Sequence, residues 1–106
     1  MKPIKYSVLA DPVGLKSRLL VRANELVSRW LPHGRRVGNE WVARNPTRVD
    51  RRPGSFKVNL RSGRWADFAT GDRGGDPISL AAFIFGLSQV EAARKLAEML
   101  GCGDGR

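Results

Sequence analysis

Arginine is the residue type in this sequence whose chemistry is most informative. Residues 35–73 hold ten basic residues, nine of them arginine, against four acidic ones, which gives a net charge of +6 out of a total of +9 for the 106-residue chain. The forked guanidinium group binds phosphate through paired donors, and a surface of such groups gains affinity by releasing counterions. The charge predicts a polyanionic partner, with nucleic acid first and an anionic membrane surface as the weaker alternative.

We expect phosphate contacts from the basic residues of this segment. Trp41 or Trp65 would stack on unpaired bases if exposed, and the alternative is that both belong to the core. The candidate DNA-binding residues are Arg35, Arg36, Arg44, Arg48, Arg51, Arg52, Lys57, Arg61, Arg64, Trp65 and Arg73.

Nucleophilic and metal chemistry find little support in the sequence. His33 is the single histidine, Cys102 is the single cysteine, and the carboxylates are scattered. An internal disulfide is impossible, and structural zinc needs a set of thiolates or imidazoles. We therefore expect no catalytic residues, no cofactor and no metal, and a cytoplasmic protein. A small nucleotide enzyme is the weakest alternative, because it needs convergent carboxylates.

The glycine-rich segment 70–75 has two interpretations. It could cradle a phosphate at a helix N-terminus, or it could form a turn that leads into a helix capped by Asp76. The capped turn is favoured, because Asp72 and Asp76 would repel a phosphate and the spacing fits no nucleotide-binding fingerprint.

The first segment predicts a helix from Pro12 to Leu31, with Asp11 as its N-cap. The apolar residues Leu15, Leu19, Leu26 and Trp30 recur at helical spacing on one side of it. The helix should end at Leu31, since a proline and a glycine follow within three residues.

Short strands are predicted for the middle of the chain. Residues 35–43 read as a hairpin that turns at Gly38-Asn39, and residues 45–54 as a loop. Strands are expected over 56–60 and 64–68, joined by a turn at Ser62-Gly63. Alternation in the first of these places Lys57 and Arg61 on a basic outer face.

Two helices should follow. Asp76-Pro77 starts an almost wholly apolar helix that stops at Gly86, and such a helix must be largely buried. Ser88 and Glu91 form a capping box for a last helix, which should run to Leu100 with Gly101 as its C-cap. The expected class is α+β, with one N-terminal helix, a small antiparallel sheet of three to five strands and two C-terminal helices. Residues 1–106 form one domain, with 1–10 and 102–106 flexible.

The order of motifs resembles a known family. The segments concerned are Trp41-Val42-Ala43-Arg44-Asn45-Pro46-Thr47-Arg48, Pro53-Gly54-Ser55-Phe56, Trp65-Ala66-Asp67-Phe68, Gly74-Gly75-Asp76 and Gly86-Leu87-Ser88. Together they are similar to the Cys-His-Cys-Cys zinc-ribbon domain at the N-terminus of bacterial and phage DNA primases. The match covers about residues 15–100, with one-residue insertions near Gly54 and Asp72.

The resemblance implies a zinc ribbon without zinc. The four ligand positions correspond to Asn45, Arg48, Asp67 and Thr70, and none of these is a thiolate or an imidazole. A cation at Arg48 would also repel Zn²⁺, whereas an ion pair between Arg48 and Asp67 could bridge the vacated site. The fold would then be held by apolar side chains packed against the helices, which are Trp41, Phe56, Val58, Trp65 and Phe68.

In primases this domain is implicated in recognising single-stranded template. The resemblance and the charge together predict a non-catalytic, monomeric module that binds nucleic acid, most of all single-stranded DNA, and has no membrane contact. It would act in primase-linked replication of a phage, plasmid or other mobile element. The alternative is a protein-interaction module that docks a polymerase or helicase through an apolar patch around Phe83, Phe85 and Leu87.

The first prediction concerns metal content. Purified protein should carry far less than one zinc ion per chain by elemental analysis, because the four ligand positions lack thiolate and imidazole groups. A chelator should leave the melting temperature unchanged. Stoichiometric zinc in the purified protein would contradict the prediction.

Overall fold

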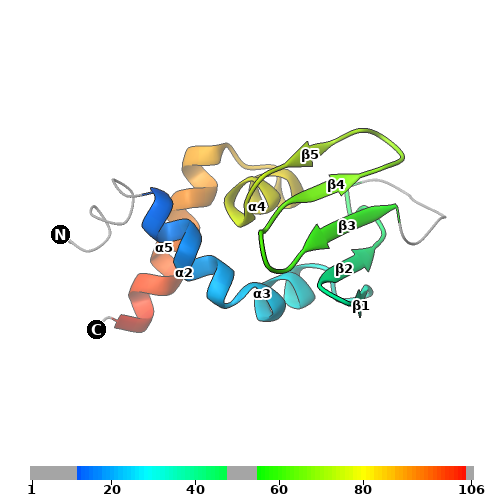
Figure 1. Ribbon diagram of the computed structural model, residues 1–106. Helices are drawn as coiled ribbons and strands as arrows, with labels where there is room; N and C mark the ends of the chain where they lie inside the picture. The colour runs from blue at the N-terminus through cyan, green and yellow to red at the C-terminus, as the bar shows by residue number, and fades with distance from the viewer. Residues whose placement is uncertain (1–11, 48–54, 105–106) are drawn as a thin grey trace.

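A computed structural model describes residues 12–47 and 55–104 of the chain. These residues form a five-stranded sheet and the helices α2 (Pro12–Val21), α3 (Ala23–Trp30), α4 (Pro77–Phe85) and α5 (Gln89–Asp104). Helices α2 and α5 lie at one end of the molecule and the sheet lies at the other (Figure 1). The α+β class predicted from the sequence is confirmed. None of the helices in the described residues is long and apolar enough to cross a membrane.

The sheet is an antiparallel meander. Its strands are β1 (Arg35–Val37), β2 (Glu40–Ala43), β3 (Phe56–Asn59), β4 (Trp65–Asp67) and β5 (Arg73–Gly74), and they neighbour one another in chain order. The predicted hairpin is confirmed, since Val37 pairs with Glu40 and Gly38 adopts a φ of +63° in the turn between them. Strand β5 was not predicted, because its two residues fall in the glycine-rich segment expected to be a loop.

The predicted N-terminal helix is two helices, which corrects the expectation of one. The chain breaks at Arg22, whose backbone N–H bonds the carbonyl of Leu19 at 3.0 Å, a tighter turn than an α-helix allows. The break lets the apolar residues serve two different cores. Leu15 and Leu19 of α2 pack among the helices, while Val27 of α3 packs beneath the sheet. Asp11, the expected N-cap, lies outside the described residues.

The buried side chains form two clusters that meet at α4. Ile78, Ala81 and Ala82 pack with α2 and α5, whereas Leu80 packs with the inner face of the sheet. This double burial explains why the sequence of α4 is apolar all round, and it confirms that the helix is largely buried. The inner face of the sheet contributes Phe56, Val58, Leu60 and Trp65.

The helix ends follow the sequence signals with one exception. Asp76 caps α4 by accepting a hydrogen bond from the Ser79 N–H at 2.8 Å, and Gly86 ends the helix in the left-handed region. Ser88 and Glu91 bond each other's backbone N–H groups at 3.2 and 3.1 Å, as a capping box requires. The predicted C-cap at Gly101 is wrong, because α5 continues to Asp104. Residues 102–104, expected to be flexible, therefore belong to a helix.

Gly74 marks the closest approach between the sheet and α4. The Trp65 indole N–H donates to the Ser79 hydroxyl at 2.9 Å, and a Cβ at position 74 would overlap both side chains. Only glycine fits there without displacing that hydrogen bond.

The second prediction tests this contact. Gly74→Ala should destabilise the protein by about 1–3 kcal/mol in urea unfolding, since Trp65 or Ser79 must move to admit the methyl group. Gly75→Ala is the matched control, because a Cβ at Gly75 meets nothing within 4 Å and its φ is not positive. Equal stability of the two variants would contradict the proposed overlap.

Candidate nucleic-acid interface

Cross-strand pairing places three basic residues in one row across the outer face of the sheet. Arg35 pairs with Val42, Val42 with Lys57, Lys57 with Ala66, and Ala66 with Arg73. Paired residues share a face, and the inner face is the one that carries Phe56, Val58 and Trp65. The row crosses all five strands, which is about 19 Å at the usual strand spacing.

Neighbouring rows of the outer face add two arginines and an aromatic ring. Arg44 lies two positions after Val42, Arg64 directly precedes the inward-facing Trp65, and both are exposed. Phe68 lies two positions after Ala66, and its N–H bonds the Ser55 carbonyl at 2.8 Å, which extends the ladder beyond β4. The outer-face surface is therefore Arg35, Arg44, Lys57, Arg64, Phe68 and Arg73, with Glu40 as an acidic neighbour opposite Asn59.

Phe68 is the functional candidate that the sequence interpretation placed wrongly. It was expected in the core, yet 72% of its surface is exposed. The Lys57 ammonium lies 5.6 Å from the centroid of its ring, a cation–π distance that holds the two side chains together on the open face. Strand alternation was the available signal, because Trp65 and Phe68 stand three positions apart and so face opposite sides.

Trp65 lies in the core, the alternative to base stacking that the sequence left open. It is 5% exposed and packs against Phe56 and Phe83, with ring centroids 5.7 and 4.8 Å away. A ring buried in this way cannot stack on a base, so the prediction of Trp65 as a DNA-binding residue is wrong. Trp41 is half-buried, and its indole N–H donates to the Leu31 carbonyl at 2.9 Å.

The remaining basic candidates are dispersed. Arg36 is exposed on the edge strand, where its Nε donates to the Gly38 carbonyl at 2.8 Å. Arg61 lies in the turn after β3 and not on the strand, so the predicted pairing of Lys57 and Arg61 on one strand face is wrong. The candidates Arg48, Arg51 and Arg52 lie outside the described residues.

A buried polar pair joins two of the four degenerate ligand positions. The Asn45 amide donates to the Asp67 carboxylate at 2.7 Å, and the two residues are only 2% and 0% exposed. The Asn45 amide oxygen accepts the Thr47 backbone N–H, and the second oxygen of the Asp67 carboxylate accepts the Ala69 backbone N–H, both at 2.8 Å. These hydrogen bonds fasten two turns to each other, one after β2 and one after β4.

The other two ligand positions behave differently. Thr70 is exposed, and its hydroxyl donates to Asp72 at 2.8 Å, away from the buried pair. Arg48 lies outside the described residues, and so does the expected Arg48–Asp67 ion pair. Across the described ranges, no three residues of the His, Cys, Asp and Glu types come together in a way that could hold a metal ion.

The alternative phosphate site at the start of α4 is occupied by the protein itself. Asp76 caps the helix and also pairs with Lys16 of α2 at 3.1 Å. The Asp76 carboxylate already accepts a backbone N–H group at the N-terminus of α4, where a phosphate would have to bind. The structure therefore supports the capped-turn interpretation of segment 70–75.

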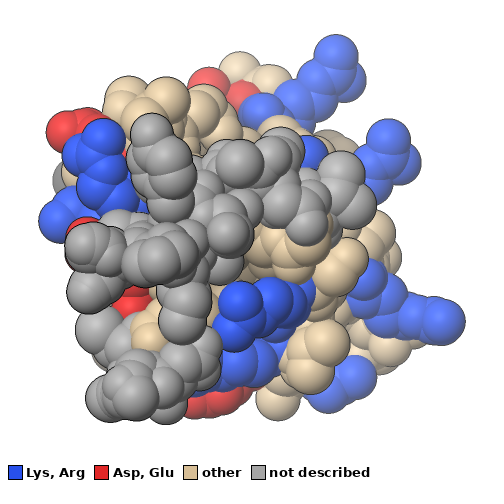
Figure 2. Space-filling model, turned by 90° about the vertical axis from the view of Figure 1, so that its left-hand side faces the viewer, with Lys and Arg blue, Asp and Glu red and all other residues tan. Residues whose placement is uncertain are grey.

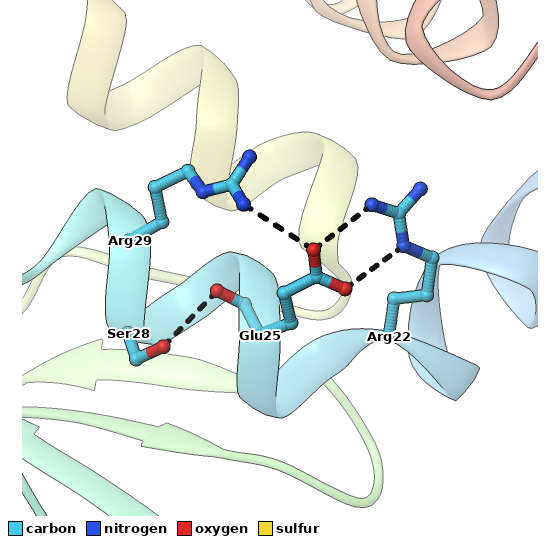
Figure 3. Close-up of polar contacts among 4 residues, drawn as sticks. All are labelled: Arg22, Glu25, Ser28 and Arg29. Carbon is cyan, nitrogen blue, oxygen red and sulfur yellow. Dashed lines mark hydrogen bonds and ion pairs between the residues drawn. The ribbon is translucent and has the colours of Figure 1, made fainter. Parts of the chain in front are cut away.

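Ion pairs in the described part of the chain involve basic residues on or beside α2 and α3, and none on the sheet. Arg22 donates to both Glu25 oxygens at 3.2 Å and Arg29 donates to the same carboxylate at 3.3 Å (Figure 3). These hydrogen bonds, and then the charge of Arg22, lower the pKa of Glu25, so the carboxylate stays ionised at neutral pH. In the described part of the chain, no ion pair involves Arg35, Arg44, Lys57, Arg64 or Arg73.

Figure 2 looks at the helical end, where Lys and Arg side chains project along the right-hand edge, the side that faces the viewer in Figure 1. Further Lys and Arg side chains lie at the left and lower centre of that view, with Asp and Glu close to them.

The third prediction concerns the buried pair. Asn45→Ala should lower the free energy of unfolding by about 1–3 kcal/mol, because the buried Asp67 oxygen loses its donor. Thr70→Ala serves as the control at an exposed ligand position and should stay within about 0.5 kcal/mol of the parent. Urea unfolding measures both, and an unchanged Asn45→Ala midpoint would show that the pair is not a structural fastening.

Comparison with protein-family models, with curated proteins and with solved structures finds no match. The resemblance to primase zinc ribbons rests on the motifs quoted from the sequence and stays a prediction. Within the described residues, the outer face of the sheet carries basic groups without ion pairs around the exposed ring of Phe68.

Proposed function

We propose that the protein is a non-catalytic module that binds single-stranded DNA across the outer face of its sheet. The observation that carries this proposal is the row of Arg35, Lys57 and Arg73 beside the exposed ring of Phe68. Following the motif order quoted above, we place the module in primase-linked replication of a phage, plasmid or other mobile element.

The charge of the face favours a nucleic acid, and its exposed ring favours a single strand over a duplex. Basic side chains spread over five strands follow a phosphate backbone without reading its sequence. A solvent-exposed aromatic ring in their midst offers a stacking surface that only an unpaired base can use. Lys57 contacts the ring and can bond a phosphate from the same position, so stacking and charge neutralisation occur at one point of the surface.

The fourth prediction separates stacking from charge. Phe68→Ala should weaken binding of a fluorescent 15-residue oligothymidylate by about 5–150-fold, since stacking on an aromatic side chain contributes about 1–3 kcal/mol per base. The variant keeps every charge, so the logarithmic salt dependence of its affinity should match that of the parent. Fluorescence anisotropy at several salt concentrations measures both quantities.

Phe85→Ala provides the matched control. Phe85 is also an exposed phenylalanine, at 53%, but it lies on α4 against Trp30 and not on the sheet. Its loss should leave oligothymidylate binding unchanged. No binding by the parent at low salt, or equal losses in the two variants, would overturn the proposed function.

A protein-interaction module is the second candidate, and one observation favours it. Trp30, Phe85, Leu87 and Met99 help to line an apolar hollow of about 390 Å³ between the helices. The patch differs from the one expected, because Phe83 packs into the sheet core beside Trp65. Under this alternative Phe85→Ala would impair function in replication and Phe68→Ala would not, the reverse of the result expected for DNA binding.

A further inference from the structure

A second hollow adjoins the outer face of the sheet. Its volume is about 680 Å³, and it lies where the end of α3 and the turn after it meet the start of β1 and the end of β2. This volume falls in the range of cavities that hold small organic ligands. Its lining includes the apolar groups of Trp30, Pro32 and Pro46 and the polar groups of His33, Arg35 and Arg44.

The floor of the hollow is preformed. The Leu31 carbonyl accepts hydrogen bonds from the Trp41 indole at 2.9 Å and from the Gly34 N–H at 3.1 Å. A side chain at Gly34 would overlap the Trp41 ring and the Val42 carbonyl, so this position has to be glycine for the turn to close. A site fixed by such contacts loses little conformational freedom when a ligand enters.

The lining suits a ligand with one flat apolar part and one anionic part. Ring and proline surfaces from Trp30, Pro32 and Pro46 can contact a heteroaromatic base, while two guanidinium groups from Arg35 and Arg44 can bond a phosphate. Both arginines are exposed, and neither takes part in an ion pair in the described part of the chain. A nucleotide has both parts at the required proximity.

The hollow is continuous with the proposed DNA-binding face. Arg35 and Val42 line it and also belong to the row that continues through Lys57. Lys57 is thus one strand spacing, about 4.8 Å of backbone separation, from the wall of the hollow. A strand lying across the sheet would pass its mouth.

We propose that this hollow binds one nucleotide, with its base against the apolar wall and its phosphate on Arg35 and Arg44. That this nucleotide belongs to a bound DNA strand rests on the proposed function. The same lining would also accept a free mononucleotide. His33, a residue with no role in the sheet face, becomes an additional ring-nitrogen donor at the rim.

Nuclear magnetic resonance with thymidine 5′-monophosphate tests the hollow directly. In the ¹⁵N-labelled full chain we expect shifts for the amides of residues 33–35 and 42–44 and for the Trp30 indole. Arg44→Ala should weaken mononucleotide binding about tenfold or more, as expected for loss of a charged hydrogen bond. Arg94→Ala removes the same charge from an exposed position of α5 and should leave mononucleotide binding unchanged.

Oligothymidylate distinguishes failure of this inference from failure of the proposed function. If the oligonucleotide binds but the mononucleotide shifts nothing, or shifts only Lys57, Ala66 and Arg73, the nucleotide site is wrong and the DNA-binding face stands. If the oligonucleotide fails to bind while the mononucleotide shifts the hollow, the DNA-binding face is wrong and the site stands. Saturating oligonucleotide that removes the mononucleotide shifts supports a nucleotide of the strand, and shifts that persist support a free nucleotide.

Discussion

The buried hydrogen bond between Asn45 and Asp67 governs how the sheet presents its outer face. It joins the chain just after β2 to the last residue of β4, with strand β3 between them. A buried carboxylate is costly unless its oxygens find donors, and here each named oxygen has one. The residues next to the pair in sequence are Arg44 and Phe68, which alternate to the exposed side. Fixing the pair inside therefore fixes an arginine and an aromatic ring outside.

Neutral and charged hydrogen-bonding groups fasten the two turns that carry Asn45 and Asp67. In a zinc ribbon, two turns are fastened by a shared ion, and that ion supplies much of the folding energy. Here the two turns are fastened by side chains that also accept the local N–H groups of Thr47 and Ala69. The hydrophobic clusters around Phe56 and α4 supply the rest of the stabilisation.

The ion pairs between described residues lie on or beside α2 and α3 and not on the sheet. Glu25 pairs with Arg22 and Arg29, and Asp76 pairs with Lys16. The outer face concentrates its basic groups around Lys57 and Phe68. Net charge alone predicted a polyanion as partner. The distribution of basic groups suggests the outer face of the sheet as the surface that would bind it. The same face and the hollow beside it share Arg35 and Arg44, so affinity for a strand and recognition of one nucleotide would depend on common residues.

The sequence by itself determined the α+β class, the hairpin at Gly38, both caps of α4, the N-terminal capping box of α5 and the burial of α4, because turn chemistry, capping and periodicity are local properties. Tertiary structure decided which aromatic ring is buried and which is exposed. Trp65 and Phe68 are both large aromatic residues, so residue type does not tell which one is buried. The pairing of β4 with β3 turns Trp65 inward and Phe68 outward. It also decided the break at Arg22, since one apolar face had to serve two cores. Finally, it brought Asn45 and Asp67 together across 22 residues, a contact that no local pattern encodes.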